Sequence, residues 1–230
     1  MSWPIDVSVV PTHLENLTDL SITLSESSPG RDDLDWLRSY PRLKYLHVEG
    51  LAQREGGNLS SLSSLTELEE LHLDAADDGI SDVGWLADLP TLHELGLNGC
   101  VDGKAFRILG ESQKSIRGLQ MMRHGGRLPR LNLKNIAHLP LLSLDLDGYK
   151  GTLDLEPLKN HERLTSLDLR NVDRFANLEY LASCPHLSWV GLSPGVVPNL
   201  QLEGLRQTVD EHYRAYYRES ERARRRGRRK

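Results

Sequence analysis

The sequence has 230 residues, of which 38% are apolar and 27% are charged, and this composition excludes a wholly disordered chain. No window approaches the roughly 18 apolar residues of a membrane span, and the first ten residues lack a secretory signal pattern, so we expect a cytoplasmic protein. Residues 218–230 carry eight Lys or Arg against two Glu, a net charge of +6, so residues 1–217 carry −11 and the whole chain −5. An acidic body argues against specific nucleic-acid binding.

Residues 1–16 begin with apolar side chains at alternate positions, namely Ile5, Val7 and Val9. Alternation of this kind is typical of a strand with one buried face. We therefore expect residues 1–16 to form an N-terminal edge or a foreshortened first turn of whatever follows.

Residues 17–198 contain the pattern Leu-x-x-Leu-x-Leu, with aliphatic substitutes, eight times at steps of 23 to 26 residues. The last two apolar positions of each match are two residues apart, so they point to one side of a strand while the residue between them points to the other. This predicts one short strand per turn, stacked into a parallel sheet over a column of leucines. The matches are Leu17-Leu20-Ile22, Leu43-Leu46-Val48, Leu68-Leu71-Leu73, Leu92-Leu95-Leu97, Ile116-Leu119-Met121, Leu141-Leu144-Leu146, Leu164-Leu167-Leu169 and Leu187-Val190-Leu192.

Three of the segments between these matches also resemble one another. Residues 35–41, 84–90 and 179–185 each place an aromatic-Leu pair shortly before a proline, the Leu four residues ahead of it. Because proline cannot continue a helix and restricts the residue before it, each segment predicts a short helical turn that ends before the next strand.

The repeats from Leu17 to Leu192 resemble a leucine-rich-repeat domain, of the bacterial kind with short convex segments. The resemblance implies an α/β solenoid of about eight turns, with a concave parallel β-sheet and short helical or irregular segments on the convex side. The Asn or Cys that usually follows the last strand leucine by three residues is present only as Cys100, so we expect its hydrogen-bonded ladder to be mostly absent. Cys100 and Cys184 are expected to be reduced, because several turns separate them.

The C-terminal part has two different patterns. Residues 199–217 carry apolar side chains at three- and four-residue steps, which predicts a helix that caps the last leucines of the array. Residues 218–230 lack such a stripe and are expected to form a basic disordered tail, which keeps the chain soluble or folds back on the carboxylates of the body.

A repeat of this geometry turns the residues between and just after the strand leucines toward the concave side. We predict that these residues bind an unidentified protein partner that is basic or of mixed charge, with Tyr45 and Trp189 as aromatic anchors. We also expect the chain to be a monomer and to need no cofactor. A face that merely keeps the protein soluble is the alternative. The candidate partner-binding residues are Tyr45, His47, Glu49, Glu70, His72, Asp74, His93, Glu94, Arg123, Asp145, Asp168, Arg170 and Trp189.

Two other functions are compatible with the sequence. The cluster of His47, His72 and Asp74 could bind a metal ion in a hydrolase, although no spacing motif supports it. The array could instead be the sensing or autoinhibitory C-terminal part of a signalling ATPase. No sequence motif indicates catalysis, and we expect the stacked Asp145 and Asp168 to be structural because a flat, open sheet offers no pocket. A serine at Gly96, on the open side of its strand, is expected to be tolerated.

Overall fold

The computed structural model describes residues 14, 16–24, 34–51, 59–75, 80, 83–99, 103–122, 131–149 and 151–193. The predicted N-terminal edge, except for residues 14 and 16, and the predicted capping helix and basic tail lie outside the described residues. Arg123 and Cys100 also lie outside them.

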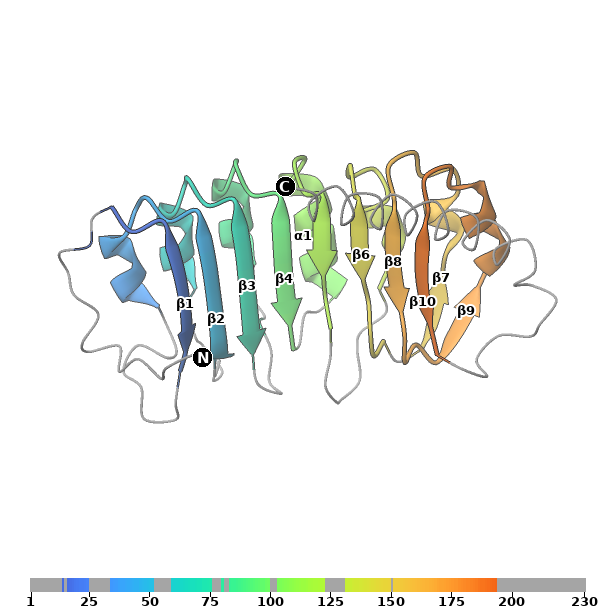
Figure 1. The fold of residues 1–230 in the computed structure, drawn as a ribbon, viewed down its shortest axis with the longest axis horizontal. Helices are drawn as coiled ribbons and strands as arrows, with labels where there is room; N and C mark the ends of the chain where they lie inside the picture. Colours follow the sequence, from blue (N-terminus) through green and yellow to red (C-terminus); the bar gives the residue numbers. More distant parts are fainter. Residues whose placement is uncertain are drawn as a thin grey trace, which may run out of the picture.

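The described chain forms an elongated array whose main element is one parallel sheet of eight strands (Figure 1). Each strand contains the second apolar position of one predicted match, and six of the eight also contain the third, which confirms the eight-turn solenoid. Met121 and Leu146, the third positions of the other two matches, directly follow β5 and β6. Six strands follow one another directly in the sheet, and β6 pairs with β8 and β8 with β10 because β7 and β9 lie elsewhere. The strands are β1 (Asp19–Thr23), β2 (Tyr45–Leu51), β3 (Glu70–Ala75), β4 (Glu94–Asn98), β5 (Gly118–Gln120), β6 (Ser143–Asp145), β8 (Ser166–Leu169) and β10 (Trp189–Leu192).

A repeated hydrogen bond sets the register of neighbouring strands. The carbonyl of Thr18 accepts from the backbone N–H groups of Lys44 and Tyr45, at 2.8 and 3.0 Å. The carbonyl of Lys44 in turn accepts from the N–H groups of Glu69, just before β3, and of Glu70, its first residue, and the same arrangement recurs to the start of β10. Each strand therefore begins at the same height as its neighbour, and equivalent residues of successive turns lie side by side.

The return segments cover one face of the sheet with short 3-10 helices, as the aromatic-Leu-Pro segments predict (Figure 1). Leu37, Leu86 and Leu181, the leucines of those segments, are fully buried. The helices are η2 (Asp35–Ser39), η3 (Ser60–Ser64), η4 (Gly84–Asp88), η5 (Leu133–Asn135), η6 (Glu156–Leu158) and η7 (Leu178–Ser183).

Two features of the convex side were not predicted. The return between β4 and β5 holds a full α-helix, α1 (Gly103–Ser112), which buries Phe106 and Leu109 against the core. The returns that follow β6 and β8 contain β7 (Thr152–Asp154) and β9 (Arg174–Ala176), which pair with each other in a second parallel sheet.

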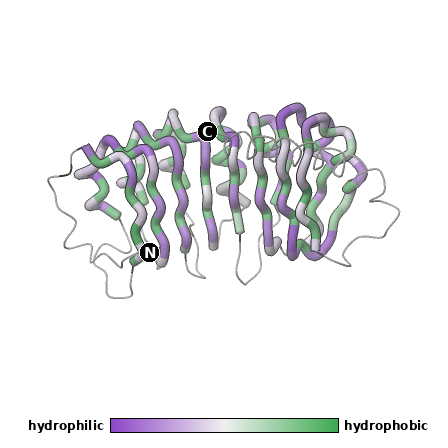
Figure 2. Tube along the Cα trace, in the orientation of Figure 1, coloured by the Kyte–Doolittle hydropathy of each residue, from purple (hydrophilic) through white to green (hydrophobic). Residues whose placement is uncertain are grey.

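Leucines from the strands and from the returns meet between these layers, and hydrophilic and hydrophobic positions alternate along the strands (Figure 2). The thiol of Cys184 is free and buried in this core, where it donates to the carbonyl of Leu158 at 3.1 Å. Among the described residues, no helix has the length and apolar character needed to cross a membrane.

Candidate functional site

The open sheet face is the face of the eight-stranded sheet opposite the 3-10 helices. Strand register arranges its side chains in three columns that run across the array. The first column is Asp19, Tyr45, Glu70, Glu94, Gly118, Ser143, Ser166 and Trp189; the second is Ser21, His47, His72, Gly96, Gln120, Asp145, Asp168 and Gly191; the third is Thr23, Glu49, Asp74 and Asn98.

Most of the candidate residues predicted from the sequence occupy these columns. His93 immediately precedes β4 and Arg170 immediately follows β8, so both flank the face. The columns contain seven carboxylates and no lysine or arginine, counted over the described strands. The geometry brings the predicted residues together in space, and it makes the face strongly acidic.

A hydrogen-bonded cluster occupies β2, β3 and β4. His47 Nε2 lies 2.9 Å from Asp74 Oδ2, and the Asn98 side-chain amide donates to Asp74 Oδ1 at 2.5 Å. The ring of His72 lies 6.0 Å from that of His47, centroid to centroid, with their planes nearly perpendicular. Burial lowers the pKa of His72, and the neighbouring His47 lowers it further.

The geometry does not favour a metal site in this cluster. Within the part of the chain that the structure describes, no group of three or more His, Cys, Asp or Glu side chains is arranged to hold a metal ion. Asp74 is engaged by His47 and Asn98 instead, so the hydrolase alternative has no support from the described residues.

Asp145 and Asp168 are neighbours in the second column, as predicted, but their environments differ. The Asp168 side chain is 7% exposed and accepts from the Arg170 guanidinium, with Nε at 2.9 and 3.0 Å and Nη2 at 2.6 Å. Asp145 accepts the Asp147 backbone N–H at 3.0 Å, and burial raises its pKa. Asp168 thus forms a direct ion pair, whereas Asp145 accepts hydrogen bonds from neutral donors.

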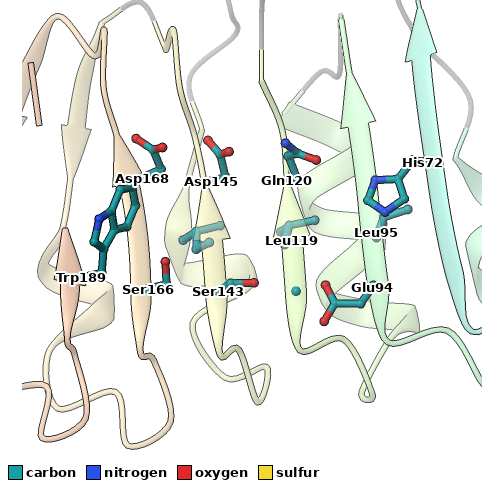
Figure 3. A pocket seen from close by; sticks show the side chains of 12 residues that line it. His72, Glu94, Leu95, Leu119, Gln120, Ser143, Asp145, Ser166, Asp168 and Trp189 are labelled. Carbon is teal, nitrogen blue, oxygen red and sulfur yellow. The ribbon is translucent and has the colours of Figure 1, made fainter. Parts of the chain in front are cut away.

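The expectation of a flat face is wrong over β4 to β10, where the surface has a hollow of about 260 Å³ (Figure 3). The first column holds only Gly118, Ser143 and Ser166 between the larger Glu94 and Trp189, and this run of small side chains forms the depression. The side chains around it are His72, Glu94, Gln120, Ser143, Asp145, Ser166, Asp168 and Trp189.

Sequence reasoning missed Gly118, Ser143 and Ser166, because it looked for charged and aromatic side chains. The available signal was positional. Each of the three residues directly precedes the second leucine of its Leu-x-x-Leu-x-Leu match, the position that Glu70 and Glu94 occupy in earlier turns. A fall in side-chain size along one column predicts a depression in the face that the column crosses.

Comparison with known proteins gives a match in structure alone. No protein-family model matches the sequence, and no curated protein matches it. Solved structures do match, among them internalin C2 from Listeria monocytogenes, at 20% identity and a TM-score of 0.51 over 80% of this chain and 76% of that chain. The plant peptide hormone receptor RGFR1, in complex with RGF2, matches at 16% identity and a TM-score of 0.52 over 84% of this chain.

The chain has the leucine-rich-repeat fold. Internalins and this receptor are leucine-rich-repeat proteins, and the eight parallel strands with leucines on the inner side agree with them. A plant ice-binding protein also matches, at 19% identity and a TM-score of 0.52 over 79% of this chain. This leucine-rich-repeat array spans 58% of the length of the ice-binding protein and 34% of that of the receptor.

Proposed function

We propose that this leucine-rich-repeat array is a non-catalytic module that binds a partner protein on the open sheet face. The observation that carries the proposal is the charge of that face: seven carboxylates stand in three columns without a lysine or arginine among the described strand positions. Unbalanced charge of one sign on an extended surface favours association with a surface of the opposite sign. The partner is therefore basic where it meets the face.

The shape of the array supports a macromolecular partner. Eight strands at a spacing of about 4.8 Å give a face roughly 34 Å long, which suits an extended protein segment better than a small molecule. The structure of the receptor RGFR1 was determined with RGF2 bound, so an array of this fold accommodates a peptide ligand. Tyr45 and Trp189 supply aromatic surface toward the two ends of the face.

The test is a comparison of two triple charge reversals. The face variant is Glu49→Lys, Glu70→Lys and Glu94→Lys, which leaves Asp74 with its hydrogen bonds to His47 and Asn98. The matched convex variant replaces three exposed carboxylates of the 3-10 helices, Asp88→Lys, Glu156→Lys and Glu179→Lys. Both variants change the net charge equally, so a difference between them reports position.

Tagged wild type and both variants are used to capture proteins from the native host, followed by quantitative mass spectrometry. We expect at least one protein that wild type and the convex variant retain and that the face variant loses, with an affinity that weakens as salt is raised. Circular dichroism must show that both variants are folded. A partner kept by the face variant and lost by the convex variant would contradict the proposal.

A further inference from the structure

We infer that the hollow between Glu94 and Trp189 binds one arginine side chain of the partner protein. The inference rests on the proposed function and names the chemical group that the partner inserts. It follows from the shape of the hollow, from the charges that line it and from the aromatic side chain at its end.

The hollow is open along the first column and closed at both ends. Glu94 and His72 stand at one end, Trp189 stands at the other, and Gln120 and Asp145 lie along one side (Figure 3). The carboxylate of Glu94 already lies where a Cβ on Gly118 would be, so a larger residue at position 118 would have to displace the end of the Glu94 side chain. Four strand spacings of about 4.8 Å separate β4 from β10, which leaves room for one long side chain.

Two carboxylates of the hollow have cationic groups near them but form no direct ion pair: Arg117 and His93 act on Glu94, and Arg170 acts on Asp145. Among the residues that the structure describes, no lysine or arginine forms an ion pair with Glu94 or Asp145. Both side chains are partly buried, and burial raises the pKa of each. A cation that enters the hollow would therefore restore the favourable electrostatics that burial removes from these two groups. Asp168 differs because Arg170 already neutralises it.

The exposed indole of Trp189 selects arginine over lysine. Trp189 is 37% exposed and is one of the large apolar side chains that the described surface leaves uncovered. A planar guanidinium stacks on an indole while its N–H groups donate to carboxylates, whereas an ammonium is compact and strongly hydrated. The Arg170 guanidinium makes this kind of multiple contact with Asp168 on the adjoining rim.

The probes are three capped tripeptides, acetyl-Gly-Arg-Gly-amide and its lysine and citrulline analogues, titrated into the full-length ¹⁵N-labelled protein. The signal is the indole N–H of Trp189, assigned with Trp189→Phe. We expect a saturable shift with the arginine peptide and at least tenfold weaker binding of both analogues, since citrulline keeps the shape of arginine without its charge. Equal binding of the arginine and citrulline peptides would overturn the proposal.

Variants separate the charge of the hollow from its shape. Glu94→Gln with Asp145→Asn removes the charge of the hollow, and Ser143→Leu fills its space but keeps its charge. Each change is expected to weaken binding of the arginine peptide at least tenfold. Asp19→Asn and Ser21→Leu, on β1 of the same face, are the matched controls and should leave the affinity unchanged. Unchanged affinity in a folded Ser143→Leu variant, checked by near-ultraviolet circular dichroism, would place the peptide outside the hollow.

The chain's own basic tail is the competing occupant. A full-length variant with the seven arginines of residues 218–229 replaced by glutamine tests it. If the arginine peptide binds this variant but not wild type, the hollow belongs to the tail and the partner's arginine is excluded. The titration uses no partner, so its failure is distinguishable from a failure of the proposed function, which the two triple variants test independently.

Discussion

The imidazole of His72 lies over Gly96 of the neighbouring strand, at the place where a side chain on residue 96 would begin. A Cβ added at Gly96 would meet His72 Nδ1, so a serine there requires the His72 ring to move, and its expected tolerance stays a prediction. The open direction of a strand position does not guarantee open space, because a large side chain on the adjacent strand can lean across it.

Gly96→Ala is expected to push the ring of His72 toward solvent. Because burial is the main cause of the lowered pKa of His72, the pKa should rise toward the ordinary histidine value. The loss of stability should stay within about 1 kcal/mol, since a side chain and not the backbone has to move. Titration of the His72 Cε1–H resonance, assigned with His72→Gln, measures the shift, and an unchanged pKa would show that the ring has not moved.

Arg170→Met is expected to lower the urea midpoint of unfolding, because it leaves the buried carboxylate of Asp168 without its cation. Adding Asp168→Asn should recover part of this loss, since an amide is less costly to bury than a charge. Urea denaturation gives the free energy of unfolding, with exposed Arg163→Met as the control. Equal losses of the free energy of unfolding in the single and double variants would mean that the unpaired charge of Asp168 is not what destabilises the protein.

Acid is expected to destabilise the protein partly through His161. This imidazole is 8% exposed; its Nε2 donates to the Leu139 carbonyl at 3.1 Å, and its Nδ1 accepts the Leu164 N–H at 3.1 Å, so the folded state holds the neutral form. Burial lowers its pKa, and the unfolded chain therefore binds the proton more readily. Stability should fall as the pH drops below about 6.5, the unfolded value, towards the lower folded pKa.

The dependence is measured from urea midpoints between pH 7.5 and 5.5. His161→Gln should lower stability at pH 7.5 and flatten the decline, whereas substitution of the exposed His186 by glutamine should leave both unchanged. A decline of the same steepness in the His161 variant would assign the effect to other groups.

The capping helix at residues 199–217 stays a prediction, and the last strand gives a reason to test it. Val190 and Leu192 of β10 are only partly buried by the described residues, whereas the matching leucines of β8 are fully buried. Truncation before Leu200 should lower the thermal midpoint or cause aggregation, because it leaves these side chains uncovered. Truncation after Tyr217 should leave the midpoint nearly unchanged, and identical behaviour of the two truncations would rule the cap out.

The eight strands were predictable because one physical requirement repeats: each turn must present two leucines to the same core. The convex elements were not predictable, because α1 and the β7–β9 pair fill space between returns of unequal length. The helical spacing of Phe106 and Leu109 occurs in only one return. Short, solitary patterns of this kind do not separate helix from irregular structure by periodicity.

The candidate face was predictable as a set of residues but not as a shape. Strand alternation placed His47, Asp74 and Asp145 on it correctly. The partnership of Asp168 with Arg170 and the hollow over Gly118 depend on side-chain rotamers across neighbouring strands, and a single sequence does not contain them.

From β2 on, the N–H groups at the start of each strand donate to a backbone carbonyl of the preceding turn. When a whole turn is inserted or deleted, the strands on either side of the change therefore still have an equivalent acceptor. Unequal recombination within the gene, by one unit of 23 to 26 codons, would preserve strand pairing on either side and add or remove one residue in each column. Such a gene can lengthen its recognition surface, or move a depression along it, in single mutational events. Selection then acts on the outward residues while the leucines keep the array folded.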